Sequence, residues 1–217
     1  MRQPSFAAVP FLIVCVLMAG CQSMYYGTME KFGVHKRDIL VSRVKSARDS
    51  QEAAKKQFAN ALEQFKSVVA VKGGELEAKY NQLNAALQKS EAEAAEVRNR
   101  IKAVEDVSDA LFQEWKAELK QYSDQNLRRA SEQKMEQTRS KCEQLISAMK
   151  MAESRIEPVL TPLRDQVLFL KHNLNAEAIS SLSGELQAVQ VNVDRLIREM
   201  ETSIAEADKF IRDMGIR

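Results

Sequence analysis

The sequence has 217 residues, of which 29% are charged and only 6% aromatic, with a formal net charge of +2 at pH 7. So few aromatic residues argue against a broad globular core, and charges of both signs mixed along the chain argue against a nucleic-acid-binding patch. Glycine is absent between Glu75 and Ser183, where Ala, Glu, Gln, Lys, Arg and Leu dominate. These residues are strong helix formers, so the sequence predicts an all-α protein.

The first twenty residues are predicted to be a signal peptide. After one early positive charge, the apolar run 6–18 has about a dozen residues, too few for a bilayer span of about 20. Ala19 and Gly20 stand directly before Cys21, an arrangement that resembles a bacterial lipobox, although Met18 replaces the usual leucine. In proteins with this signal the peptide is cut before the cysteine, which then carries palmitate and other acyl chains. We therefore predict lipidation of Cys21; the alternatives are an ordinary signal peptide, or a buried N-terminal helix with an incidental cysteine.

The residue after this cysteine predicts the location. Gln22 stands where an aspartate usually retains a lipoprotein in the inner membrane. By the sorting rules that the resemblance implies, the protein is expected in the outer membrane, facing the periplasm. Several acyl chains on one residue would make the membrane a stable partner. Residues 21–37 are then the lipid anchor and tether, and residues 38–214 form an elongated helical domain.

Residues 38–122 are predicted to form a first helical hairpin. Asp38 is the expected cap of a helix that runs to about Lys72, where Gly73 and Gly74 end it. A second helix follows and is expected to continue without a break. Its apolar residues, like those of the first helix, recur in alternating steps of four and three, as in helices that pack lengthwise. These seam residues are Leu40, Val44, Ala47, Ala54, Phe58, Ala61, Phe65 and Val68, then Leu76, Tyr80, Leu83, Leu87, Ala94, Val97, Ile101, Val104, Leu111, Trp115 and Tyr122.

Residues 127–214 are predicted to form a second hairpin, after a break near residues 122–126 where polar turn formers cluster. Pro158 and Pro162 fall inside the first of its helices, so a kink or a short break is expected there; alternatively, Pro158 opens a separate helix. The seam residues are Thr138, Cys142, Leu145, Met149, Ala152, Ile156, Val159, Leu163, Val167 and Leu170, then Leu182, Leu186, Val189, Val193, Leu196, Met200, Ile204, Ala207 and Ile211.

The connection between the last two helices has residues suited to helix ends. Lys171 and His172 stand in a last turn, Asn173 is the expected left-handed cap, and Asn175 is the expected cap of the final helix. Cys142, the one thiol left after processing and lipidation, is expected to be a small buried hydrophobe; a reactive thiol or an intermolecular bridge is the alternative.

The predicted fold is therefore all-α, with about four long helices in two elongated antiparallel coiled-coil hairpins and a third helix kinked at its prolines. The pattern leaves open whether the hairpins close into one bundle, extend end to end or self-associate.

The segment 157–182, EPVLTPLRDQVLFLKHNLNAEAISSL, is the most distinctive part of the sequence. Together with ALFQEW at 110–115 and the lipobox-like start, it resembles an uncharacterised bacterial family, domain-of-unknown-function family 2959, over nearly the whole mature chain. The resemblance implies a secreted helical lipoprotein with no settled activity. Some members carry names that refer to the coiled-coil part of a DNA-repair ATPase, but this chain has no GxxxxGK loop to hold nucleotide phosphates.

No residue pattern indicates a catalytic, cofactor-binding or metal site. The chain contains neither a G-x-S-x-G elbow nor an H-E-x-x-H pair, and its two histidines, His35 and His172, lie in different segments. We therefore expect a non-enzymatic protein without a cofactor, which acts as a coiled-coil scaffold or adaptor in the cell envelope. The alternative is a binding protein that holds an apolar ligand or lipid between its hairpins.

The connection after the prolines is the best candidate for a contact with a partner. Local rules of helix formation are broken there, and such places are more often functional than regular helices. Leu168 and Phe169 extend the apolar face beyond what a seam needs, and His172, Asn173 and Asn175 are polar neighbours in the sequence. We hypothesise that these five residues contact an unidentified envelope protein or a second copy of the chain.

Overall fold

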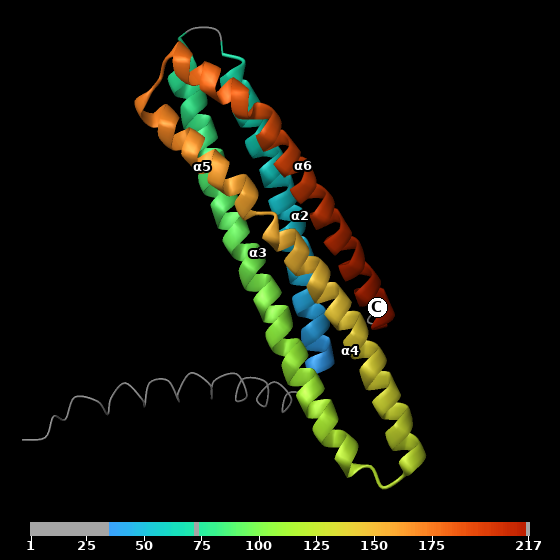
Figure 1. Cartoon of the computed structure of the whole chain (residues 1–217). Helices are drawn as coiled ribbons and strands as arrows, with labels where there is room; N and C mark the ends of the chain where they lie inside the picture. Colours follow the sequence, from blue (N-terminus) through green and yellow to red (C-terminus); the bar gives the residue numbers. More distant parts are fainter. Residues whose placement is uncertain (1–34, 72–73, 216–217) are drawn as a thin grey trace, which may run out of the picture.

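The computed structural model describes residues 35–71 and 74–215, and these ranges contain no strand. The helices run up and down along a common long axis (Figure 1). They are α2 (Lys36–Val69), α3 (Leu76–Glu118), the short 3-10 helix η1 (Leu119–Gln121), α4 (Gln125–Ser154), α5 (Glu157–His172) and α6 (Ala176–Asp213). The predicted all-α class and the uninterrupted second helix of the first hairpin are therefore confirmed.

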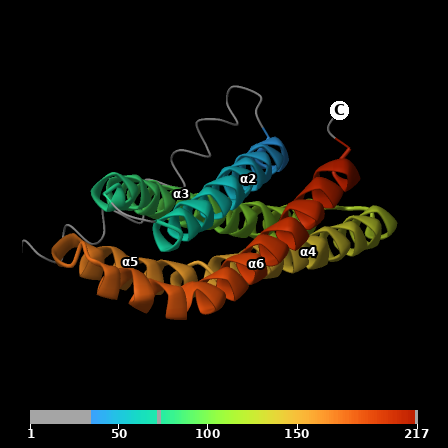
Figure 2. The same cartoon turned by 90° about the horizontal axis from the view of Figure 1, so that it is seen from above.

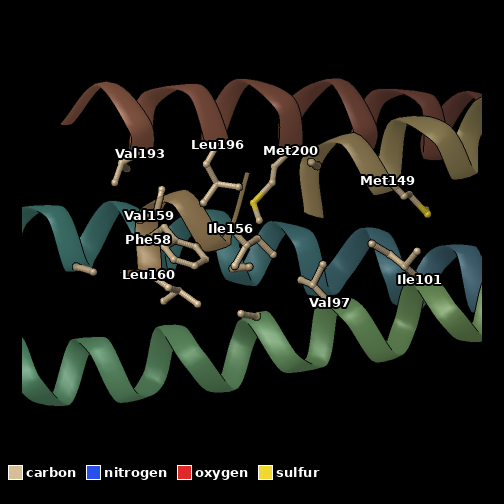
Figure 3. Close-up of a cluster of buried hydrophobic side chains, with 14 of the residues drawn as sticks. Phe58, Val97, Ile101, Met149, Ile156, Val159, Leu160, Val193, Leu196 and Met200 are labelled. Atoms are coloured by element: carbon tan, nitrogen blue, oxygen red, sulfur yellow. The ribbon is translucent and has the colours of Figure 1, made fainter. Parts of the chain in front are cut away.

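The two hairpins close into one bundle. Helix α2 packs against α3 in its own hairpin and against α6 in the other, while α4 and α5 both contact α3 and α6. Seen from above, α5 lies on the opposite side of the bundle from α2 and α3, and α6 runs obliquely from the side of α5 toward α2 (Figure 2). Side chains from all five α-helices meet in a single core (Figure 3), among them Phe58, Val97, Ile101, Met149, Ile156, Leu160, Leu196 and Met200.

The predicted seams form this core with few exceptions. All eight seam residues of α2 are fully buried, as are Ala94 and Ala152 of facing helices, so small side chains allow close approach. The aromatic residues of the second seam differ. Tyr80 and Trp115 are half-buried, and Tyr122 is 39% exposed because α3 has already ended at Glu118.

Polar side chains inside the core join particular pairs of helices. Gln57 of α2 donates from Nε2 to the Ala86 carbonyl of α3 over 2.9 Å. Ser203 of α6 donates to Oε1 of Gln51 in α2 over 2.8 Å. Because an unpaired buried polar group is costly, each bond favours one lengthwise register over shifted ones.

The bend predicted at the prolines is a short break between two helices. Helix α4 ends at Ser154, and α5 begins at Glu157 with Pro158 in its first turn, as the alternative interpretation predicted. Pro162 lies inside α5 and has no N–H to donate to the carbonyl of Pro158. That carbonyl instead accepts a bond of 3.3 Å from Nδ2 of Asn192 in α6.

Several predicted helix ends need correction, and others are confirmed. His35, not Asp38, occupies the cap position of α2, and Asp38 lies in the first turn. The predicted break near 122–126 is present, and α4 begins there because Asp124 accepts hydrogen bonds from the amides of Asn126 (2.7 Å) and Leu127 (3.1 Å). Glycines 73 and 74 were expected to end the first helix, but α2 ends at Val69, and residues 72–73 lie outside the described ranges.

Candidate functional site

The predicted contact region lies at the end of the bundle opposite the start of α2 (Figure 1). We call residues 168–175 the distal tip. Two asparagines hold its turn: Asn173 donates from Nδ2 to the Phe169 carbonyl over 3.0 Å, and Asn175 caps α6 by accepting from the Ala178 amide over 3.0 Å. The capping role of Asn175 is as predicted. Asn173, however, has a φ of −133°, so the prediction of a left-handed cap was wrong.

Three large apolar side chains of the distal tip face solvent. Leu168 is 60% exposed, Phe169 41% and Leu174 42%, although the adjoining Val167 and Leu170 are buried in the core. Helix α5 therefore has apolar residues on its outer as well as its inner face, and the outer ones do not contribute to the core. Clustered apolar residues on a surface are typical of interaction sites.

The five predicted contact residues lie at the end of α5 and in the turn that follows it. The imidazole of His172 is exposed beside the apolar group, and the two asparagines have their amides partly used in the turn. The sequence analysis missed Leu174, which lies between the two asparagines. The available signal was an apolar residue between two helix-capping asparagines. A residue in that position belongs to neither helix, so no heptad seam would bury its side chain.

A cavity of about 270 Å³ lies near the other end of the bundle, between α2, α3, α4 and α6. Its apolar wall includes Leu111, Trp115 and Phe210. The cations Arg37 and Lys134 also line it, together with Lys141 and Asp213, which pair with each other. An anionic group attached to a small apolar body would match these walls in charge and polarity. The sequence analysis did not identify this cavity, because its walls come from four helices that are far apart in the sequence.

The Cys142 thiol is buried, as predicted. Its Sγ lies 3.2 Å from Oγ of Ser108 in the facing helix α3, and the side chain is fully covered. Burial in an apolar environment raises the pKa of this thiol, which keeps it protonated and unreactive at neutral pH.

The described helices offer little scope for other kinds of site. Within residues 35–71 and 74–215, no three His, Cys, Asp or Glu side chains gather closely enough to hold a metal ion. No helix in these ranges has both the length and the apolar character needed to cross a bilayer. The predicted lipidation site, Cys21, lies outside the described residues.

Comparison with known protein families matches residues 25–214 to the family described as "Protein of unknown function (DUF2959)". No curated protein matches the chain. The family match spans all of the described helices and thus includes the distal tip, the cavity and the connection between α3 and α4.

Proposed function

The chain belongs to the DUF2959 family of proteins of unknown function, and from this premise we propose that it is a periplasm-facing lipoprotein that acts as a scaffold or adaptor in the cell envelope. In this proposal Cys21 carries the acyl chains that hold the protein in the outer membrane, and the distal tip contacts a partner. The observation that supports the proposal is the exposure of Leu168, Phe169 and Leu174 together at the end of the bundle opposite the start of α2.

The length of the bundle suits an adaptor. Helix α2 has 34 residues, so at 1.5 Å per residue it extends about 51 Å from the end where the proposed tether enters. The distal tip would thus lie far from the anchor, within reach of other envelope components.

Several charged groups on the sides of the bundle pair with one another across helices. Arg48 pairs with Asp208 over 2.8 Å, joining α2 to α6, and Arg164 pairs with Glu91 over 2.6 Å, joining α5 to α3. Exposed pairs of this kind contribute little stability each, but they occupy the charged groups that would otherwise attract a partner. The distal tip instead exposes three apolar side chains that the core does not need, namely Leu168, Phe169 and Leu174.

Photo-crosslinking in living cells tests this proposal. A photoreactive amino acid at Leu168 or Leu174 is expected to capture one dominant envelope protein, identified by mass spectrometry. Probes at Met151 and Val191, which are 47% and 46% exposed on the sides of α4 and α6, are matched controls and should not capture it.

A double substitution makes the test decisive. Leu168→Ser with Phe169→Ser should abolish capture from a probe at Leu174 while circular dichroism retains the helical signal, since neither side chain belongs to the core. Capture of only the chain itself, from the distal tip and the sides alike, would replace the adaptor with a self-assembling structural lipoprotein. The intact mass of the protein purified from membranes tests acylation of Cys21 separately.

The cavity supports a second candidate function, which is binding of a small anionic lipid or other amphiphile between the hairpins. Arg37 comes from α2 and Lys134 from α4, so both hairpins contribute a cation to it. Organic extraction of the purified protein followed by mass spectrometry should then release a stoichiometric amphiphile. Arg37→Glu with Lys134→Glu should remove it, and an extract without such a compound from the unsubstituted protein would dismiss this function.

A further inference from the structure

The connected ends of α3 and α4 project beyond the other helices (Figure 1). Lys36, the first residue of α2, pairs with Glu114 over 2.8 Å, which marks the level on α3 where α2 begins. The chain continues for eight residues past Glu114 before it turns at Tyr122, about 12 Å along a helix. We call residues 115–135 the finger.

The finger is an ordered element with its own contacts. Trp115 donates from Nε1 to Oγ of Ser131 over 2.9 Å. This hydrogen bond links the α3 part of the finger to its α4 part. Leu119 and Met135 are each only 5% exposed. Asp124 caps α4 at the turn, so the end of the finger has a defined shape.

The outer surface of the finger combines apolar and basic side chains. Leu127 is 59% exposed and Tyr122 39%. Between residues 116 and 129 there are four exposed cations, against two carboxylates, of which one is the cap Asp124; the cations are Lys116, Lys120, Arg128 and Arg129. The rest of the finger adds one charge of each sign, Glu132 and Lys134.

Several cations on the sides of the bundle pair with a carboxylate of a neighbouring helix. Lys141 of α4 pairs with Asp213 of α6 over 2.6 Å, and Arg48 of α2 pairs with Asp208 of α6. None of the four cations between residues 116 and 129 has an ion-pair partner among the residues that the structure describes. Their charge is therefore available to an anionic surface outside the molecule.

The finger also lies at the end where the proposed anchor would be. The chain enters α2 at Lys36, on the same end of the bundle, and residues 21–34 precede the described part. Fourteen residues can span at most about 50 Å, which exceeds the projection of the finger several times. A bilayer that holds Cys21 is therefore within reach of Tyr122 and Leu127, without any rearrangement of the bundle.

We propose that the finger docks on the anionic phospholipid surface of the membrane that holds the anchor. Leu127 and Tyr122 enter the interfacial layer, where amphipathic aromatic and apolar side chains are favoured, and Lys120, Arg128 and Arg129 contact lipid phosphates. This inference rests on the proposed acylation of Cys21. It adds an orientation of the bundle, whose long axis would extend away from the membrane so that the distal tip lies at the end far from the lipid.

The test uses chains that begin at Cys21, because the core extends only from Ile39 to Met214 and is complete in them. The Cys21 thiol is coupled to a maleimide lipid in the vesicle, while the buried Cys142 is spared. The single natural tryptophan is replaced by Trp115→Phe, and either Leu127→Trp or Leu168→Trp supplies the probe. These two leucines are matched, at 59% and 60% exposure, on opposite ends of the bundle.

Brominated phospholipids then report which end meets the bilayer. On vesicles that contain phosphatidylglycerol, quenching is expected at position 127 and not at 168. Each basic contact with an anionic surface changes association about fivefold, so Arg128→Glu with Arg129→Glu should weaken docking about 25-fold or more and bring quenching at 127 down to the level at 168. Equal quenching at both ends, or quenching that is the same on phosphatidylcholine alone, would overturn the proposal.

A second measurement avoids the tryptophan substitutions. A photoreactive amino acid at Leu127 in the otherwise unaltered chain should attach to phospholipid in cells, whereas the same probe at Leu168 should not. Attachment at Leu127 to a protein or to peptidoglycan, without lipid, would assign the finger another occupant and overturn the proposal. Since chemical coupling replaces acylation in the vesicle experiment, its failure leaves lipidation of Cys21 untouched, and a missing acyl mass in cells leaves the docking result untouched.

Discussion

At the scale of single residues, Glu157 is the most connected carboxylate at the break between α4 and α5. Arg164 of the same helix donates to it, and Arg98 of α3 approaches it to 3.1 Å. The hydrogen bond from Arg164 is the main reason that the pKa of Glu157 lies below its ordinary value. Folding therefore favours the ionised form, and the stabilisation is present above the unfolded-state pKa and is lost as the pH falls through the folded-state pKa.

Glu157→Gln should reveal this dependence on pH. The side chain of Glu157 is 51% exposed, so the solvent-screened contribution is about 0.5 kcal/mol or less. Near neutral pH the variant should unfold at a slightly lower temperature than the unsubstituted protein. The difference should shrink once the pH falls below the ordinary pKa of glutamate and should vanish below the folded-state pKa. Thermal unfolding followed by circular dichroism between pH 7 and 3 measures both. Glu185→Gln, on the exposed side of α6, is the control, and a gap that persists unchanged at low pH would contradict the assignment.

The burial of individual side chains shows which features the sequence predicts correctly and which it does not. The seam predicted the burial of Phe58 and Cys142, because a position on a heptad seam fixes which face of a helix turns inward. It predicted burial for Tyr122 as well, and there it was wrong. The periodicity continues in the sequence after the helices that would cover it have ended. Exposure of Leu168 and Phe169 was predictable, since both lie outside the seam, whereas the cavity was not.

At the scale of elements, α5 has an unusual compensation for a proline. An ordinary residue at position 162 would donate its amide to the carbonyl of Pro158, and Pro162 has none. Asn192 of α6 supplies that hydrogen bond from a neighbouring helix over 3.3 Å. The carbonyl that Pro162 leaves without its intrahelical partner thus takes part in a hydrogen bond between α5 and α6.

A double-mutant cycle measures this exchange. Asn192→Ala should destabilise the protein by about 1 kcal/mol, the usual cost of such a bond. In the Pro162→Ala background, where the amide of residue 162 is restored, the same substitution should cost close to nothing, giving a coupling of at least about 0.5 kcal/mol. Denaturant unfolding gives the free energies. Equal costs of Asn192→Ala in both backgrounds would show that the asparagine does not compensate for the proline.

Sequence reasoning at this scale succeeded where the local chemistry is unambiguous. Asn175 caps α6 as predicted, and the glycine-free run 76–118 is one helix. It was less successful where several local solutions compete. Asp38 was expected to cap α2, but His35 occupies that position, and two prolines four residues apart allowed a kink, a break or a new helix.

At the scale of the whole molecule, the main fact that the sequence left open is the closure of the hairpins. A seam identifies the face that a helix buries and does not identify the helix that covers it. In the structure, Arg48 and Asp208, Gln51 and Ser203, and other pairs join α2 to α6, so that one core serves both hairpins. The sequence does not show which buried polar residues of the two hairpins will pair, because these residues come together only in the folded bundle.

A shared core predicts a single cooperative unfolding transition. Trp115, the one tryptophan, reports the α3–α4 connection, and circular dichroism reports all helices. Phe58→Ala should cost about 3–5 kcal/mol and shift both signals equally, although Phe58 is distant from Trp115. Two separated transitions, with only one moved by the substitution, would mean that the hairpins fold independently. Val191→Ala, at an exposed site, should leave both signals nearly unchanged.

The antiparallel contact between α2 and α6 has a mechanical consequence. A pulling force between the start of α2 and the distal tip would act on the first residues of both helices, in opposite directions along their length. The helices are then loaded in shear, so the contacts from Arg48–Asp208 to Lys55–Glu201 and the core between them resist together rather than one turn at a time. The bundle is thus arranged to transmit tension between its two ends without peeling apart.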